Sequence, residues 1–180
     1  MNDSVPSLSR RHLLAGLPAI PLLAQNGYRP QLSVIGPASA AQAKQAGFHR
    51  CELGTDAFRP GVVEKTAAEY KAAGVDLVSI YVNTTYYEAA AAEKETATLT
   101  ELAAVVQPLG VRAIVANPNP KNWDTYTPKT DAELQLQAAG LNRLGEALKK
   151  RGLALHLHHH WTEVSSKSSL TATEPYRSRA

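Results

Sequence analysis

Apolar runs alternate with amphipathic segments from residue 32 onward, and a glycine precedes most of the runs. The apolar runs cover residues 32–36, 48–53, 75–82, 111–116 and 153–160. The last four follow directly after Gly47, Gly74, Gly110 and Gly152. Glycine readily adopts the left-handed conformation that ends a helix, so each of these positions predicts a helix C-terminus followed by a strand.

The segments between the apolar runs carry signals for helix starts. Residues 98–101 and 130–133 read as capping boxes, in which a threonine and a glutamate satisfy the first backbone groups of a helix. Pro60 falls in the predicted first turn of a helix over residues 60–70. Another segment has leucines at helical spacing, which predicts a helix with one apolar face: Leu134, Leu141, Leu144 and Leu148.

Five strands alternating with four helices predict an α/β fold with a parallel sheet. Residues 77–82 and 111–116 are almost continuously apolar, as parallel strands are when both faces are covered. Two architectures share this pattern, the doubly wound sheet and the (β/α)8 barrel of TIM type. A complete barrel takes about 250 residues, and the chain has 180. A barrel here would be incomplete, with about five of the eight βα strands.

Composition narrows the class of protein without changing this fold. A hydrophobic content of 44% fits one globular domain. The net charge of +3 comes from basic and acidic residues spread along the chain, so we expect no nucleic-acid partner. Cys51 is the single cysteine, which excludes an intrachain disulfide and a cysteine-rich zinc site. We predict that Cys51 is a core residue rather than a nucleophile.

An export signal is predicted at the N-terminus, over residues 1–25. Arg10 and Arg11 precede an apolar stretch, and this order resembles the twin-arginine signal pattern. The stretch is shorter than the roughly 20 residues of a membrane span, so we expect no stable span after the signal is cleaved. An amphipathic helix is the alternative, but Pro18 and Pro21 would interrupt it. The prediction is a periplasmic or otherwise exported protein.

Polar residues collect where the predicted strands end. Glu52 lies near the end of the second strand, Asn83 follows the third, and Asn117 and Asn119 follow the fourth. In parallel α/β folds ligands bind at the carboxyl ends of the strands, so these residues are candidates for ligand contacts. Asparagine also favours turns, so each strand end taken alone fits an ordinary loop.

The last predicted strand carries the clearest candidate site. Alternation along it puts Leu153, Leu155 and Leu157 on the side of the helices. The same alternation puts three imidazoles on the other side: His156, His158 and His160. Imidazole binds divalent metals and transfers protons near neutral pH. Glu163 adds a carboxylate suited to binding a metal or acting as a base.

The segment from residue 151 to residue 164 resembles the fifth-strand motif of the sugar phosphate isomerase/epimerase superfamily, the xylose isomerase-like TIM barrels. The matching positions are Gly152, His158, His160 and Glu163. Residues 115–120 are similar to the fourth-strand motif of this family, and Glu52 stands where its second strand often ends in Glu-Leu. The resemblance covers residues 30–164.

This resemblance implies a divalent-metal-dependent isomerase or epimerase that acts on a sugar or sugar derivative by proton transfer next to a carbonyl group. It implies Glu163 as a ligand of Mn, Mg, Co or Zn, and Glu163 and His160 as catalytic residues. The remaining candidates would contact the sugar: His156, His158, Asn117, Asn119, Asn83 and Glu52. The alternative is a non-catalytic fragment that binds sugar or metal weakly.

The chain departs from the family after Glu163. Residues 165–180 are polar and follow neither a helical nor a strand period, which predicts a disordered tail. We therefore expect a truncated product, with a natural half-barrel that pairs with another copy as the alternative. Either form leaves sheet edges unpaired, which predicts a homo-oligomer or aggregation through the open sheet.

Overall fold

The computed structural model describes residues 31–125 and 127–160. The chain divides into two units, Met1–Leu32 and Ser33–Ala180, and all the elements named here belong to the second. The predicted signal at residues 1–25, the predicted tail at residues 165–180 and Glu163 lie outside the described residues, so they stay predictions. Among the helices of the described ranges, none is both long and apolar enough to cross a membrane.

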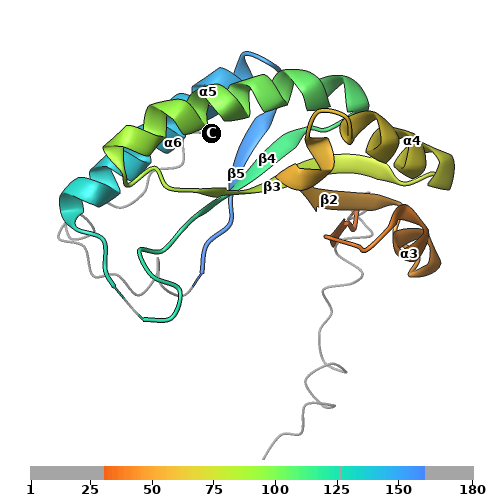
Figure 1. The fold of residues 1–180 in the computed structure, drawn as a ribbon, viewed down its shortest axis with the longest axis horizontal. Coiled ribbons are helices and arrows are strands. Elements are labelled where there is room, and N and C mark those ends of the chain that lie inside the picture. The colour runs from red at the N-terminus through yellow and green to blue at the C-terminus, as the bar shows by residue number, and fades with distance from the viewer. Residues whose placement is uncertain (1–30, 126, 161–180) are drawn as a thin grey trace, which may run out of the picture. The chain divides into compact units, whose positions relative to one another are not determined.

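Five parallel strands form one sheet, and their order in space is their order in the chain (Figure 1). The strands are β1 (Val34–Ile35), β2 (Arg50–Gly54), β3 (Asp76–Thr84), β4 (Ala113–Pro118) and β5 (Ala154–Leu157). A doubly wound sheet reverses its order at a switch point, whereas a barrel adds each strand beside the previous one. The unbroken order confirms the predicted α/β fold as part of a TIM-type barrel.

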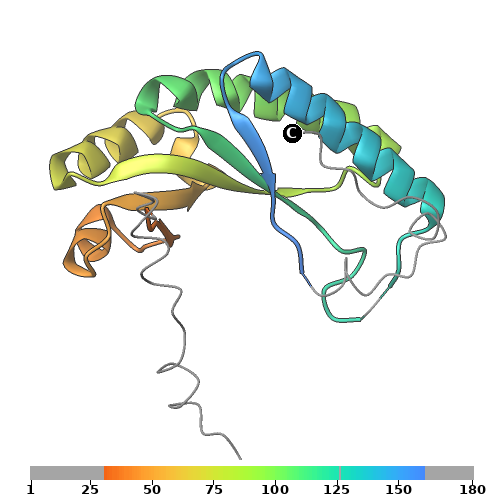
Figure 2. The same ribbon diagram turned by 180° about the vertical axis from the view of Figure 1, so that it is seen from behind.

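Helices alternate with these strands. They are α3 (Ala40–Gln45), α4 (Val63–Ala73), α5 (Ala89–Val106) and α6 (Asp131–Lys149), with short 3-10 segments at Thr55–Phe58 and Gln107–Leu109. In both views, α5 and α6 lie on the same side of β3, β4 and β5 (Figure 1, Figure 2). The four glycines that precede strands all have positive φ angles, which confirms them as the ends of the preceding helical segments.

The helix starts agree with the sequence in one case and differ in two. Thr130 Oγ1 accepts from the Glu133 N–H (3.3 Å), and the Thr130 N–H donates to Glu133 Oε2 (2.7 Å), so this capping box is confirmed. The capping box predicted at residues 98–101 is wrong, because α5 already begins at Ala89 in a run of helix-favouring alanines. Pro60 precedes α4 instead of lying in its first turn.

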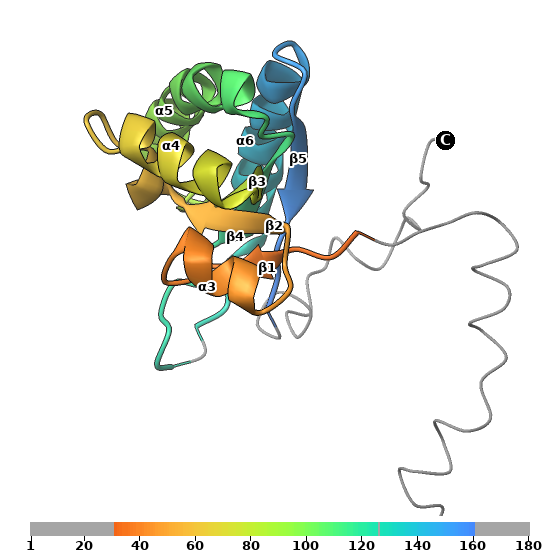
Figure 3. The same cartoon turned by 90° about the vertical axis from the view of Figure 1, so that its right-hand side faces the viewer.

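The main core lies between the sheet and the two long helices, which an end-on view places along one side of the strands (Figure 3). Strands β3 and β4 and helices α5 and α6 all contribute fully buried side chains: Ile80, Ala103, Val106, Ile114, Ala116, Leu144 and Leu148. Burying each leucine contributes about 1.5–3 kcal/mol through removal from water. The predicted apolar face of α6 is therefore confirmed, and it fixes the positions of the strands whose carboxyl ends carry the candidate residues.

Strand β5 is shorter than predicted, and only its first part is packed. It ends at Leu157, although the N–H of His158 still donates to the carbonyl of Ala116 at 2.8 Å. Leu153 is buried and Leu155 packs against the core, but Leu157 is 52% exposed. The prediction that Leu157 packs against helices is wrong. β5 is also the edge strand of the described sheet, so β4 alone pairs with it.

Candidate functional site

Alternation along the strands gives the sheet a second face, which turns away from α5 and α6. On β3, Ile80 and Val82 enter the core, so Tyr81 and Asn83 point to the other side. The strand register then aligns residues of neighbouring strands on that side. We call this set the polar face, and it consists of Glu52, Ser79, Tyr81, Asn83, Val115, Asn117, His156 and His158. Five predicted site residues therefore share one face.

An amide pair joins the carboxyl ends of β3 and β4. Asn117 Nδ2 donates to Asn83 Oδ1 at 2.8 Å, as expected for residues that are register partners. Asn117 is only 1% exposed, whereas Asn83 is exposed. The pair therefore sets a buried amide beside one that reaches solvent.

Asn119 extends the same edge by two residues. Its backbone N–H donates to the Thr84 carbonyl at 2.8 Å, which continues the β3–β4 ladder beyond the end of β4. The side-chain oxygens of Asn117 and Asn119 are both buried and accept no hydrogen bond from any described residue. Two unused acceptors at one strand end are unusual, because buried polar atoms are normally hydrogen-bonded.

Aromatic rings continue the site from β3 across to β5. The rings of Tyr81 and His158 meet edge to face at 5.4 Å between centroids, and His158 meets His160 at 4.8 Å. Trp123, from the loop between β4 and α6, meets His160 at 5.5 Å. The structure thus brings His158 and His160 together, whereas His156 is exposed and makes no described ring contact. The sequence did not single out Tyr81 or Trp123.

The loop that carries Trp123 is fastened to the start of α6. Lys121 Nζ and Glu133 Oε1 form an ion pair at 2.7 Å, and the same glutamate completes the capping box. Asn122 Oδ1 accepts from the N–H groups of Asp124 (2.7 Å) and Thr125 (3.0 Å). Because these contacts flank Trp123, they help to set where its ring lies against His160.

Glu133 makes this attachment sensitive to pH. The hydrogen bond from Lys121, followed by that from the Thr130 backbone, lowers the Glu133 pKa from 4.5 to about 2. A depressed carboxyl pKa adds stability that is fully present above pH 4.5 and is lost as the pH falls toward 2. We expect Lys121→Ala to raise the Glu133 pKa toward 4.5, measured by NMR titration of its carboxyl carbon.

The control for this titration is Lys149→Ala, at the opposite end of α6. This variant also removes one positive charge from the chain, but it leaves both partners of Glu133 in place. We expect it to leave the Glu133 pKa unchanged. An equal rise of the pKa in both variants would mean that net charge, and not the local hydrogen bond, depresses it.

The side chains near β2 are buried groups that are held protonated or hydrogen-bonded. Ser79 Oγ donates to Glu52 Oε2 at 2.6 Å, and Glu52 is 6% exposed. Burial and then the charge of Glu52 raise the pKa of Tyr81, so the Tyr81 hydroxyl stays protonated near neutral pH.

Cys51 is fully buried, and burial followed by the charge of Asp76 raises its pKa to about 11. It is therefore an inert core residue, as predicted.

The described residues do not by themselves form a metal site. Within residues 31–125 and 127–160, no three His, Cys, Asp or Glu side chains are grouped so that they could hold one ion. His158 and His160 lie side by side, but the carboxylate predicted to bind the metal, Glu163, lies outside the described residues.

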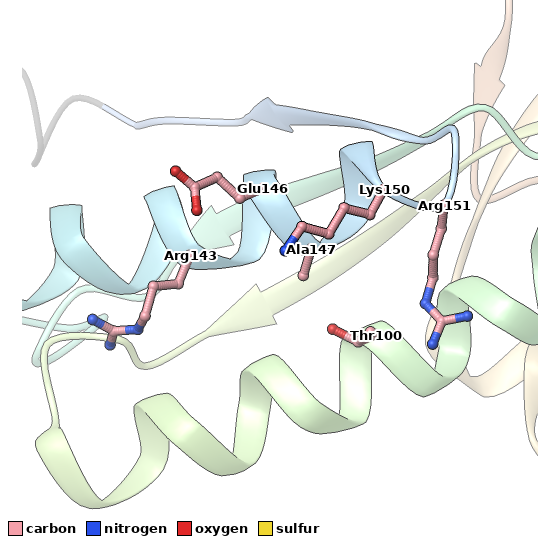
Figure 4. A pocket seen from close by; sticks show the side chains of 6 residues that line it. All are labelled: Thr100, Arg143, Glu146, Ala147, Lys150 and Arg151. Atoms are coloured by element: carbon pink, nitrogen blue, oxygen red, sulfur yellow. The ribbon is translucent and has the colours of Figure 1, made fainter.

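A separate hollow of about 430 Å³ lies between α5 and α6, on the helix side of the sheet (Figure 4). It is lined by Thr100, Arg143, Glu146, Ala147, Lys150 and Arg151. The Thr100 hydroxyl already donates to the Thr96 carbonyl at 2.6 Å. Lys150 and Arg151 lie at the end of α6, where positive charge complements the helix dipole. The hollow lies on the helix side of the sheet, so it is separate from the polar face.

The strand order and the polar residues at the strand ends define a partial TIM barrel with a candidate ligand site at its carboxyl ends. No family model matches the chain, and no curated protein matches it. Solved structures do match. A sugar phosphate isomerase/epimerase from Parabacteroides distasonis matches with a TM-score of 0.60 and 16% identity, covering 82% of this chain and 57% of that one.

Two other solved structures give the same result. An L-ribulose 3-epimerase matches with a TM-score of 0.55 and 17% identity, over 72% of this chain and 49% of that one. A D-allulose 3-epimerase from Methylomonas sp., solved in complex with D-allulose, matches with a TM-score of 0.57 and 18% identity, over 72% and 51%. The similarity establishes the fold, and the chain spans about half the length of these proteins.

Proposed function

We propose that this chain forms part of an isomerase or epimerase that acts on a sugar or sugar derivative by moving a proton at the carbon next to a carbonyl group. The observation that carries the proposal is the convergence of an amide pair and a series of rings at the carboxyl ends of β3, β4 and β5. Such a surface offers both hydrogen bonds and apolar ring faces to a sugar. The barrels that match include L-ribulose 3-epimerase and D-allulose 3-epimerase, which supports this class of reaction.

In this proposal the polar face binds the sugar and His160 transfers the proton. A neutral imidazole accepts the proton from carbon and leaves an enediolate. In an isomerisation the imidazolium returns the proton to the neighbouring carbon; in an epimerisation the second group, Glu163, would donate a proton to the opposite face of the same carbon, so no oxidant or other reactant is consumed. The ring of His158 contacts those of Tyr81 and His160, and in this proposal His158 holds a sugar hydroxyl. The other residues proposed to bind sugar are His156, Asn83, Asn117, Asn119 and Glu52.

We propose that the reaction depends on a divalent metal, and Glu163 is the only residue of this chain that we propose as its ligand. Its assignment as metal ligand and second proton-transfer group rests on the likeness of residues 151–164 to a fifth-strand motif, and Glu163 lies outside the described residues. The test of function therefore includes Mn, Mg, Co and Zn as added ions.

A second candidate function is sugar binding without turnover. It is favoured by the described residues, which provide hydrogen-bonding groups and rings but no group of three metal-ligating side chains. The two functions differ in one observable, the exchange of a carbon-bound proton with solvent.

We expect the full chain, incubated with D-allulose or D-fructose in deuterated water with each of the four metals, to catalyse deuterium uptake at the carbon next to the carbonyl. Proton NMR follows the loss of the carbon-bound signal, and the same spectra report sugar binding through line broadening. His160→Ala is expected to lower the exchange rate at least 100-fold, in the range of general acid-base catalysis.

His159→Ala is the matched control, because it removes a neighbouring imidazole that is exposed and makes no described ring contact. It is expected to leave the exchange rate unchanged. Binding without deuterium uptake under all four metals would replace the enzyme by the second candidate, and the absence of both would refute both.

A further inference from the structure

We infer that Asn117 and Asn119 determine specificity by accepting hydrogen bonds from two hydroxyl groups of a neutral polyol, so that the site takes an unphosphorylated sugar. The inference rests on the proposed function and adds the chemical class of its substrate. Its starting observation is the pair of buried side-chain oxygens, Asn117 Oδ1 and Asn119 Oδ1, that accept no hydrogen bond from the described residues. A ligand that donates hydrogen bonds satisfies both oxygens.

In the structure, Asn83 orients the Asn117 amide. Its Nδ2 donates to Asn83 Oδ1 at 2.8 Å, and turning the amide over would set two acceptor oxygens against each other. Asn117 is also buried, with only 1% of its surface exposed. With this orientation, Asn117 Oδ1 is the atom left for a ligand, and an amide oxygen only accepts hydrogen bonds.

Asn119 lies on the same side of the sheet edge. The hydrogen bond from its N–H to the Thr84 carbonyl continues the ladder by one step, so the alternation that places Asn117 on the polar face extends to Asn119. Two residues along a strand span roughly 6–7 Å. One sugar molecule with several hydroxyl groups bridges such a distance, whereas a single hydroxyl does not.

The charge of the polar face is unfavourable for a phosphate group. None of the residues of the polar face is a lysine or an arginine, and Glu52 adds a carboxylate to it. Lys121, the nearest basic residue in sequence, is held by Glu133 at 2.7 Å. A phosphate brings only acceptors and negative charge, and it requires donors such as arginine, lysine or free backbone N–H groups. A hydroxyl group brings the donor that both asparagines need.

The test compares the affinities of the full chain for D-fructose and for D-fructose 6-phosphate, measured by NMR titration, and the melting temperatures of variants. We expect D-fructose to bind at least tenfold more tightly than its phosphate ester. Asn119→Ala is expected to lower the affinity for D-fructose at least tenfold without lowering the melting temperature, because the removed oxygen has no described partner. Asn119→Asp keeps an acceptor and is expected to retain affinity within threefold.

Thr84→Val is the control, since the Thr84 hydroxyl is buried at the same strand end but donates to the Asn117 backbone carbonyl at 3.4 Å. It is expected to leave the affinity for D-fructose unchanged. Tighter binding of the phosphate ester, or unchanged affinity in Asn119→Ala, would overturn the inference while leaving sugar binding intact. Failure of the unmodified chain to bind either sugar would overturn the proposed function as well.

Discussion

Gly140→Ala is expected to lower the free energy of unfolding by about 1–3 kcal/mol, the usual cost of forcing extra volume into a packed core. A Cβ atom at Gly140 of α6 would lie 2.4 Å from a ring carbon of Tyr86, and two further ring atoms would lie within 3.1 Å. The ring cannot easily withdraw, because Tyr86 is fully buried and its hydroxyl is hydrogen-bonded to Thr96 Oγ1 at 3.0 Å. The absence of a side chain at residue 140 is what lets α6 approach the end of β3.

Gly145→Ala is the matched control on the same helix. A Cβ atom there would lie 3.6 Å from Leu155, which is ordinary contact, so the higher helix propensity of alanine should dominate. We expect a gain of about 0.5–1 kcal/mol. Urea unfolding of the two variants measures both values, and a Gly140→Ala variant as stable as Gly145→Ala would show that Tyr86 can repack.

The sequence predicted the order of elements because local signals mark them. A glycine with positive φ ends each helical segment before a strand, and the Thr130 capping box starts α6. The start of α5 was missed because a second threonine-glutamate pair, at residues 98–101, imitates a cap inside a helix. There the Thr100 hydroxyl bonds back to the carbonyl of Thr96, which lets threonine occupy the helix interior.

The candidate site was predictable only in part, for a physical reason. Strand alternation is local, so His156 and His158 could be assigned to one side of their strand from the sequence, while Asn83 and Asn117 could be placed only at strand ends. The ring contacts depend on tertiary structure. Tyr81 meets His158 only because β3, β4 and β5 are neighbours, and Trp123 reaches His160 from a loop with no regular period. Trp123 is one of two tryptophans in the chain, and its place in a polar loop is the sequence signal that could have indicated it.

His158→Ala is expected to weaken binding of D-allulose about 30-fold, or about 2 kcal/mol, because His158 provides both a hydrogen bond and ring contacts at the centre of the site. Its ring lies 5.4 Å from Tyr81 and 4.8 Å from His160, so its loss also releases the ring proposed to transfer the proton. Isothermal titration calorimetry of the full chain measures the affinity.

His158→Phe separates the two contributions. Phenylalanine retains edge-to-face contacts of about 0.5–1.5 kcal/mol but offers no hydrogen bond. We therefore expect His158→Phe to be more stable than His158→Ala but to bind D-allulose no more tightly. His159→Ala removes an adjacent exposed imidazole and should change neither quantity. If His158→Phe bound D-allulose as tightly as the unmodified chain, then His158 would act only as a packing ring. The sugar hydroxyl would then have to be held by the amides of β3 and β4 alone.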